Sequence, residues 1–404
     1  MRRLSMLIGT AGLALAALVL ALLAGELLLR ALGQSYYWAI AKRPDPVLGW
    51  RPPPHSAAWQ RFEGAALVET NALGFRDRDH AEPKPAGTLR VVVLGDSFTE
   101  AVQVPLAQTW WRLLGDRLQS DCNPGGEIEV LNFAVSGYST AQALLTWRRY
   151  ARGYSPDLAI LAFFIGNDVA ENVPALDAEP LRPYLLPGAG PLVLDDGFVQ
   201  SDAYLAATSP VGRARQWLLE RSRIAQLWVQ ARDAGRLRRL AAAGRADAGS
   251  AHEPQEPGVD NGIYRPPADA DWALAWAATE AMLGAFAEEA RAAGVEPVLM
   301  LIGTGVQVHP DAGAAARFAA ALGVDDLGYP VRRLLSAAAR AGLPAVNLPA
   351  LLAAQAERDG VLLHGLPGAR AGFGHWNAAG HRAAAEATAA LVCELLPRAN
   401  RAAP

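Results

Sequence analysis

A serine at the end of an apolar segment is the first residue in this sequence that could do nucleophilic chemistry. Residues 91–100 read VVVLGDSFTE, so four apolar residues are closed by Gly95. This pattern predicts a buried parallel strand that ends in a tight turn. Ligands of open α/β sheets bind beyond the carboxyl ends of the strands, which would place Ser97 over the site. Because a Gly-Asp-Ser turn also forms for purely conformational reasons, Ser97 needs support from other residues.

Two later segments could bring hydrogen-bond donors to the same edge of the sheet. Gly137 follows an apolar segment at 128–134, and Asn167 follows another at 158–165. Ser139 with Gln142 forms a capping box, so a helix should begin just after Gly137. Free N–H groups near a helix start, and the amide of Asn167, suit a developing oxyanion. Taken alone, each residue could instead serve only its turn.

A histidine near the C-terminus could act as the base. His375 lies in the segment GHWNAAGH at 374–381, where Asn377 begins an alanine-rich helix. A neutral histidine, with a pKa of about 6.5, can accept a serine proton and return it to a leaving group. His381 fits a helix-start position better than that of a second base.

Four segments resemble the signature blocks of the SGNH (GDSL-type) hydrolase superfamily, in the family's order: VLGDSF, NFAVSGYST, FFIGNDV and GHWNAAGH. The resemblance covers most of the chain from about Asp45 onward. It implies a flavodoxin-like three-layer α/β/α domain, an ester carbonyl as the group attacked, and no cofactor or metal. The site residues it implies are Ser97 as nucleophile, His375 as base, and Ser97, Gly137 and Asn167 as the oxyanion hole, with Asp96 and Asp168 as supporting side chains.

One departure from the family pattern concerns the acid that orients the histidine. The family usually has an aspartate two or three residues ahead of it, where this sequence has Phe373 and Gly372. Loss of the orienting acid from a triad can cost about 10⁴ in kcat. Three alternatives stay open: a Ser97–His375 dyad, which we favour, an acid from elsewhere such as Asp359, or a weakened enzyme.

The remaining pattern alternates strands with helices, which predicts a five-stranded parallel sheet with right-handed crossovers. The expected strands are 91–94, 128–134, 158–165, 297–302 and 345–348. The expected helices of this domain are 109–119, one after Gly137, 271–292, 312–321, 331–341 and 377–396.

The N-terminal segment is directed to a membrane. Residues 4–25 carry no charge, and about 20 such residues cross a bilayer as a helix. Without an A-x-A-like cleavage site, the segment fits an uncleaved anchor better than the closely similar signal peptide. Flanking charges orient it only weakly. Resemblance to membrane-anchored relatives implies a bacterial inner-membrane protein, with one pass and a periplasmic domain. The aromatic residues 36–38 could sit at the interface or pack on the domain.

The expected organisation is therefore an anchor at 1–30, a lead-in segment at 31–87, and an SGNH-like domain at 88–400 with an insertion at about 171–267. In the lead-in segment, Asn71, Gly74 and Arg76 are expected to fix a loop beside the cleft. In the insertion, 211–240 has helical spacing and a basic face, suited to anionic lipid, to a glycan or simply to solvent. Residues 241–261 are expected to form a loop.

Composition narrows the function classes. A formal net charge of -3 argues against bulk attraction to nucleic acid. Two cysteines exclude a disulfide-dense scaffold and a cysteine-rich zinc module. These cysteines, Cys122 and Cys393, follow or lie in helices on the same face of a flavodoxin-like sheet, so they either form a disulfide or stay free and buried.

The function that these residues favour is a membrane-anchored serine esterase that removes a small acyl group such as acetyl from an envelope or extracellular saccharide. An O-acyltransferase could use the same site, because an acyl-enzyme can be discharged to a sugar hydroxyl. A third alternative is a glycan-binding protein without catalysis, for which the missing aspartate is the best evidence.

Overall fold

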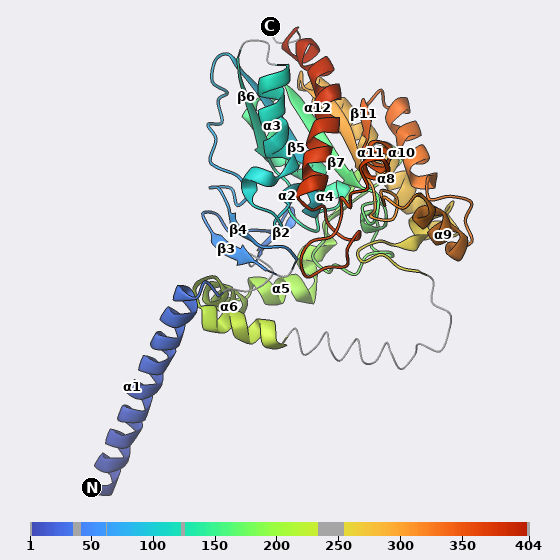
Figure 1. Ribbon diagram of the computed structural model, residues 1–404. Coiled ribbons are helices and arrows are strands. Elements are labelled where there is room, and N and C mark those ends of the chain that lie inside the picture. Colours follow the sequence, from blue (N-terminus) through green and yellow to red (C-terminus); the bar gives the residue numbers. More distant parts are fainter. Residues whose placement is uncertain (1, 35–41, 62, 123–125, 233–253, 402–404) are drawn as a thin grey trace.

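The computed structural model describes residues 2–34, 42–61, 63–122, 126–232 and 254–401 (Figure 1). Its centre is a five-stranded parallel sheet in the order β11-β10-β7-β5-β6. Numbered along the chain these strands run 2-1-3-4-5, which is the flavodoxin-like order. The expected fold class is confirmed. The strands are β5 (Thr88–Leu94), β6 (Glu127–Asn132), β7 (Leu158–Phe164), β10 (Glu296–Ile302) and β11 (Ala345–Asn347).

This topology decides where chemistry can occur. The order of connection reverses between β5 and β7, which are neighbours in the sheet, and ligands of open α/β sheets bind beyond such a switch point. Every residue of β5 and β7 is buried, as expected for strands that helices cover on both faces. The turns that follow these two strands carry Ser97 and Asn167.

Two groups of helices cover the sheet. One group consists of α3 (Trp110–Asp121), α11 (Leu348–Asp359) and α12 (Ala378–Arg401), and the other of α4 (Thr140–Arg149), α8 (Ala270–Ala292) and α10 (Tyr329–Arg340). A further helix, α9 (Ala312–Leu322), ends at Gly323 in the left-handed conformation. The predicted helices agree within about three residues at most ends. Ser139 caps α4 with the full capping box, as its sequence indicated, whereas α11 was not predicted.

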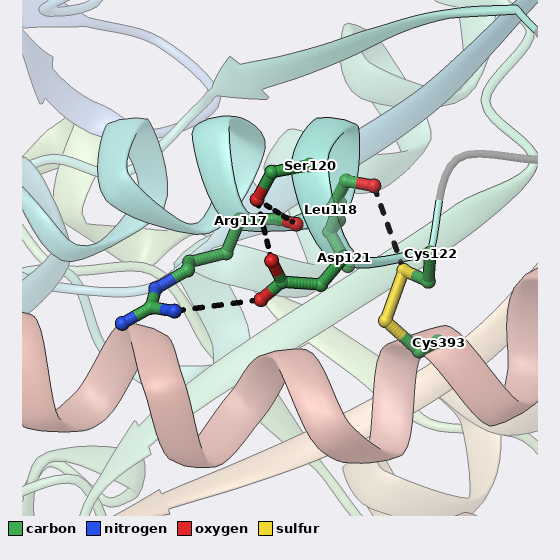
Figure 2. Close-up of a disulfide and its surroundings, with 6 residues drawn as sticks. All are labelled: Arg117, Leu118, Ser120, Asp121, Cys122 and Cys393. Carbon is green, nitrogen blue, oxygen red and sulfur yellow. Dashed lines mark hydrogen bonds and ion pairs between the residues drawn. A yellow bond between two sulfur atoms is a disulfide. The ribbon is translucent and has the colours of Figure 1, made fainter.

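A disulfide joins the two helices of the first group. Cys122 follows the last turn of α3, and Cys393 lies in α12, with their Cα atoms 5.6 Å apart (Figure 2). The bond links positions 271 residues apart in sequence. It therefore ties the C-terminal helix to the helix that follows the first strand of the sheet.

The lead-in segment forms two antiparallel hairpins. One pairs β1 (Arg43–Asp45) with β2 (Gly49–Arg51), and the other pairs β3 (Ala57–Gln60) with β4 (Ala66–Glu69). Both hairpins lie at the end of the sheet nearer to α1 (Figure 1). The lead-in segment is thus part of the wall around the carboxyl edge of the sheet.

The insertion differs from its prediction in one respect. It contains β8 (Tyr184–Leu186), β9 (Val193–Asp195), α5 (Asp202–Thr208) and α6 (Pro210–Arg221). The single helix expected over 211–240 is wrong, because α6 stops at Ser222 in an extended conformation and a second helical segment occupies 223–232. The break coincides with hydrogen bonds from Ser222 and Arg223 to the carboxylate of Glu26. The rest of the predicted helix, and residues 241–253 of the predicted loop, fall outside the described residues.

The N-terminal helix α1 (Arg2–Ala31) projects away from the α/β domain (Figure 1). Its stretch from Ile8 to Ala31 is long and apolar enough to cross a membrane. The large apolar side chains along it are exposed rather than packed on the domain. The aromatic residues 36–38 lie outside the described residues.

Replacing both cysteines should weaken the hold of α12 on α3. We expect Cys122→Ser combined with Cys393→Ser to lower the free energy of unfolding by about 2–4 kcal/mol, because the disulfide restricts the unfolded chain. Denaturant unfolding of the detergent-solubilised chain measures this change. A reductant should lower the denaturant midpoint of the wild type to that of the double variant. It should leave the midpoint of the double variant unchanged. Equal midpoints for wild type and variant would contradict the expectation.

Candidate active site

The candidate nucleophile stands at the first position of a short helix. The sheet strand β5 ends at Leu94, and α2 (Ser97–Glu100) begins three residues later. Gly95 is needed between them, because a Cβ there would lie 2.8 Å from the carbonyl oxygen of Ala162 in β7. The Asp96 carboxylate caps α2 by accepting the Phe98 N–H at 2.9 Å. These constraints hold the Ser97 hydroxyl over the carboxyl edge of the sheet.

Arg76 of the lead-in segment supports the other end of α2. Its buried guanidinium donates to the carbonyl oxygens of Glu100 at 2.9 Å, of Val104 at 2.7 Å, and of Ala101. Burial lowers the pKa of Arg76 to about 10, which still leaves it charged at neutral pH. The lead-in arginine therefore fixes the end of the helix that carries Ser97, whereas the sequence predicted that it would fix a loop beside the cleft.

His375 faces Ser97 from the loop before α12. The serine Oγ lies 2.8 Å from the Nε2 atom of His375. The loop is held by His364, whose Nδ1–H donates to the Gly374 carbonyl at 2.6 Å. Burial lowers the pKa of His364 to about 4, so it stays neutral. The ring of Phe98 packs 5.0 Å from the His375 ring and restricts its orientation.

The second nitrogen of His375 meets a carboxylate from the lead-in segment. Glu63 Oε2 lies 2.6 Å from His375 Nδ1, and Oε1 accepts the backbone N–H of His375 at 3.1 Å. Gly374 makes room for this contact, because a Cβ there would approach Glu63 Oε1 to 2.9 Å. A carboxylate only accepts, so the proton of neutral His375 resides on Nδ1. The lone pair of Nε2 then points at the serine hydroxyl.

Glu63 is charged in this environment. Its side chain is 13 % exposed and that of His375 is 26 % exposed. Burial acts to raise the pKa of Glu63, but the hydrogen bonds and charge of His375 outweigh it and the pKa lies below its ordinary value. The ionised carboxylate can therefore both fix the tautomer of His375 and stabilise an imidazolium.

This geometry corrects the expectation about the orienting acid. The dyad that the sequence favoured is wrong, since His375 has a carboxylate partner. Asp359 is not that partner, because it is exposed and pairs with Arg358 at 2.9 Å. Sequence reasoning missed Glu63 because it lies 312 residues from His375 and stands in no motif. The only signal was indirect: a histidine block without its aspartate leaves a place for an acid from elsewhere.

Two donors stand at the ends of the strands beside β5. Gly137 follows β6 with a φ of +80°, and within the described chain its N–H has no hydrogen-bond partner. Asn167 follows β7, and one N–H of its amide donates to Glu171 Oε1 at 2.9 Å. The second amide N–H has no partner among the described residues. Both groups can therefore donate to a ligand at the switch point.

Arg182 of the insertion links these two donor segments. Its guanidinium donates to the Gly137 carbonyl at 2.7 Å and pairs with Glu171 at 3.2 Å. Glu171 in turn holds the Asn167 amide. Burial raises the pKa of Glu171 to about 7, against the opposing charge of Arg182. One buried arginine thus positions the turns after β6 and β7 relative to each other.

The two aspartates expected to support the site act on backbone groups. Burial raises the pKa of Asp96 to about 6. Asp168 accepts the Phe164 N–H at 2.9 Å, and burial, with the charge of Asp96 second, raises its pKa well above the ordinary value. They hold the turns after β5 and β7 in shape.

His381 is built into the core. It accepts the backbone N–H of Trp110 at 3.3 Å, and burial lowers its pKa to about 3. It therefore stays neutral and joins α12 to α3. Within the described ranges, no group of three or more His, Cys, Asp or Glu side chains is arranged to hold a metal ion.

A cavity of about 1010 Å³ adjoins the Gly137 turn. The lead-in segment contributes Lys42 and Trp50, the strand turns contribute Ser136 and Gly137, and the insertion closes the remaining side. The insertion residues in its lining include Glu179, Arg182, Ala206, Val211 and Arg215. The cavity thus combines one aromatic side chain with several charged ones next to the donor at Gly137.

Known proteins similar to this chain were found in three comparisons. A family described as GDSL-like Lipase/Acylhydrolase matches residues 91–186. An arylesterase of Vibrio mimicus is 31% identical over 72 residues, which are 18% of this chain and 34% of the arylesterase. The chain thus spans about a third of the length of that curated relative.

Among solved structures, TesA is 17% identical with a TM-score of 0.35, covering 74% of this chain and 95% of TesA. The acetyl xylan esterase AlAXEase is 10% identical with a TM-score of 0.38, covering 75% and 100%. The psychrotrophic esterase EstA of Pseudoalteromonas sp. is 11% identical with a TM-score of 0.33, covering 76% and 98%.

The family match contains three of the four segments singled out in the sequence, those of Ser97, Gly137 and Asn167. The five-stranded parallel sheet brings these three segments to one edge. The resemblance to SGNH (GDSL-type) hydrolases that the sequence indicated is thus confirmed over residues 91–186, which match the GDSL-like Lipase/Acylhydrolase family.

Proposed function

We propose that this chain is a serine esterase anchored in a bacterial inner membrane, which removes a small acyl group such as acetyl from a saccharide of the cell envelope. The observation that carries the proposal is the continuous hydrogen-bonded chain from Ser97 through His375 to Glu63, at 2.8 Å and 2.6 Å. A serine, a base and an acid in this relation are the parts needed for acyl transfer to a hydroxyl group.

The chemistry would proceed in two displacements. The Ser97 oxygen attacks the ester carbonyl while His375 Nε2 takes its proton, and Glu63 stabilises the imidazolium. The tetrahedral oxyanion is met by the N–H groups of Ser97 and Gly137 and by the Asn167 amide. The C–O bond to the alcohol breaks, and His375 protonates the departing oxygen. Water, deprotonated by His375, then attacks the acyl-enzyme and releases the acid with Ser97 restored.

The cavity beside Gly137 favours a substrate with both apolar and polar groups. Ala206 and Val211 offer apolar surface at its lining, and Glu179 and Arg215 offer hydrogen-bonding groups. Pockets that combine apolar surface with a few placed polar groups suit ligands with both characters, as in a sugar ring with its hydroxyls.

Two features favour a membrane-attached domain outside the cytoplasm. The stretch from Ile8 to Ala31 has the length and apolarity of a membrane span. The disulfide between Cys122 and Cys393 fits an oxidising compartment such as the periplasm. Lipid contact through residues 4–25 is therefore part of the proposal.

An O-acyltransferase remains the second candidate, because the same acyl-enzyme can be discharged to a sugar hydroxyl entering through the cavity. The glycan-binding alternative loses its main argument, since Glu63 occupies the place of the missing acid.

The first test asks whether Ser97 is an activated nucleophile. We expect a fluorophosphonate probe to add once to the detergent-solubilised full chain, as measured by intact mass, and not to add to Ser97→Ala. The labelled enzyme should also lose acetyl release from an acetylated oligosaccharide. No adduct on the folded wild type would contradict the catalytic proposal. If the acetyl group appears on an added glycan instead of as free acetate, the chain acts as an acyltransferase and not as an esterase.

The second test asks whether Glu63 orients the base. We expect Glu63→Gln to lower kcat by a factor on the order of 10⁴, because a neutral amide can hold the wrong tautomer of His375. Asp359→Asn is the matched control and should leave kcat unchanged, since Asp359 is exposed and pairs with its neighbour Arg358. Equal rates for the two variants, with unaltered thermal unfolding, would remove Glu63 from the mechanism.

A further inference from the structure

The insertion presents an exposed apolar surface beside the C-terminal end of α1. On α6, Val211 is 79 % exposed and Trp217 is 57 % exposed. Leu218 is also exposed and lies seven residues after Val211, so both side chains are on one helix face. Trp228, in the helical segment 223–232, is 65 % exposed. Neighbouring exposed apolar side chains of this size mark an interaction surface rather than ordinary solvent exposure.

Arginines border this surface. Arg213, Arg215 and Arg221 of α6 are exposed, and the Arg221 guanidinium lies 5.1 Å from the centre of the Trp217 ring. A short amphipathic helix with tryptophan and aliphatic residues on one face and arginines around it is typical of helices that lie in a bilayer interface. The arginine heads can meet phosphate groups while the apolar side chains enter the acyl boundary.

Hydrogen bonds fix this surface to α1. The Glu26 carboxylate accepts the Ser222 hydroxyl at 3.1 Å and the backbone N–H groups of Arg223 at 2.9 Å and Ile224 at 3.2 Å. These are first N–H groups of the second helical segment, which lack partners inside that segment. Glu26 also pairs with Arg30 at 2.8 Å. The junction of the two insertion helices is therefore attached to the last turns of α1.

The height of this junction follows from the length of α1. The span from Ile8 to Ala31 has 24 residues, which rise about 36 Å in a helix at 1.5 Å each. The hydrocarbon core measures about 30 Å. The last turn or so of α1, near Glu26 and Arg30, then falls in the headgroup layer. The insertion residues that are bonded to Glu26 then lie in the same layer. Figure 1 shows α6 beside this end of α1.

We propose that α6 and the segment 223–232 form a membrane-contact platform, whose face of Val211, Trp217, Leu218 and Trp228 lies in the interface of the bilayer that α1 spans. This inference rests on the membrane anchoring given under Proposed function. Val211 also lines the cavity beside Gly137. The platform therefore holds the rim of that cavity at the bilayer surface, where esters attached to or lying on the membrane would meet it.

The experiment measures the depth of single nitroxide labels. Val211→Cys, Trp217→Cys and Trp228→Cys are made in the full chain, labelled, and reconstituted in vesicles of phosphatidylcholine and phosphatidylglycerol. The native cysteines are bonded to each other and do not react. Collisions with oxygen, which concentrates in lipid, are compared with collisions with a water-soluble nickel chelate. Leu351→Cys, at a residue 50 % exposed on α11, is the aqueous control, and Leu18→Cys reports on α1.

We expect the three platform labels to favour oxygen over the chelate, at a depth of about 5–10 Å below the headgroups. The Leu351 label should favour the chelate, and the Leu18 label should be deepest. If the chelate reaches the platform labels as readily as the Leu351 label while the Leu18 label is protected, the platform is contradicted. The membrane anchor would be supported in that case. Labels reached by neither reagent would mean that protein covers the surface, which also overturns the inference. A chelate-accessible Leu18 would reject the anchor itself.

Discussion

The hydrogen bond between Glu63 and His375 is the constraint on which the site depends. Because a carboxylate accepts and never donates, this contact leaves His375 only one neutral tautomer, the one with a free lone pair toward Ser97. The second bond, from the His375 backbone N–H, fixes the loop as well as the ring. Gly374 is required for both, since any side chain there would collide with the glutamate. The geometry of the serine and histidine thus follows from a residue outside the α/β domain.

Segments outside the sheet shape the rest of the site in a similar way. The lead-in segment supplies Arg76, which donates hydrogen bonds to carbonyl oxygens at and just after the C-terminal end of the helix of Ser97. The insertion supplies Arg182, which connects the Gly137 turn with the carboxylate that holds Asn167. The topology of the sheet determines which turns meet at its carboxyl edge. The lead-in segment and the insertion then fix the conformation of those turns.

The sequence predicted the sheet well for physical reasons that can be named. Buried parallel strands such as β5 and β7 must be continuously apolar, and their turns carry glycine where two backbones approach closely, as at Gly95. The capping box at Ser139 is a local signal and was found where expected. Glu63 is different, because its partner lies far along the chain and no periodicity or turn rule connects them. The break at Ser222 was missed for the same reason, since it coincides with contacts to a carboxylate of α1, far away in the sequence. Local sequence rules predict helices and strands, whereas contacts between segments that are distant in the sequence become apparent only in the structure.

The origin of Glu63 changes what counts as the minimal working unit of this chain. A boundary drawn at the first strand of the sheet would discard residues before 88, and with them both the glutamate and Arg76. Such a fragment would keep the whole parallel sheet and every recognisable motif, yet it would lack the carboxylate bonded to His375 and the arginine bonded to the helix of Ser97. A search for sequence motifs would miss Glu63 as well. The residues just before His375 lack the usual aspartate and would suggest an inactive protein. A relative that lacks that aspartate should therefore be examined for a carboxylate donated by the segment that precedes the sheet.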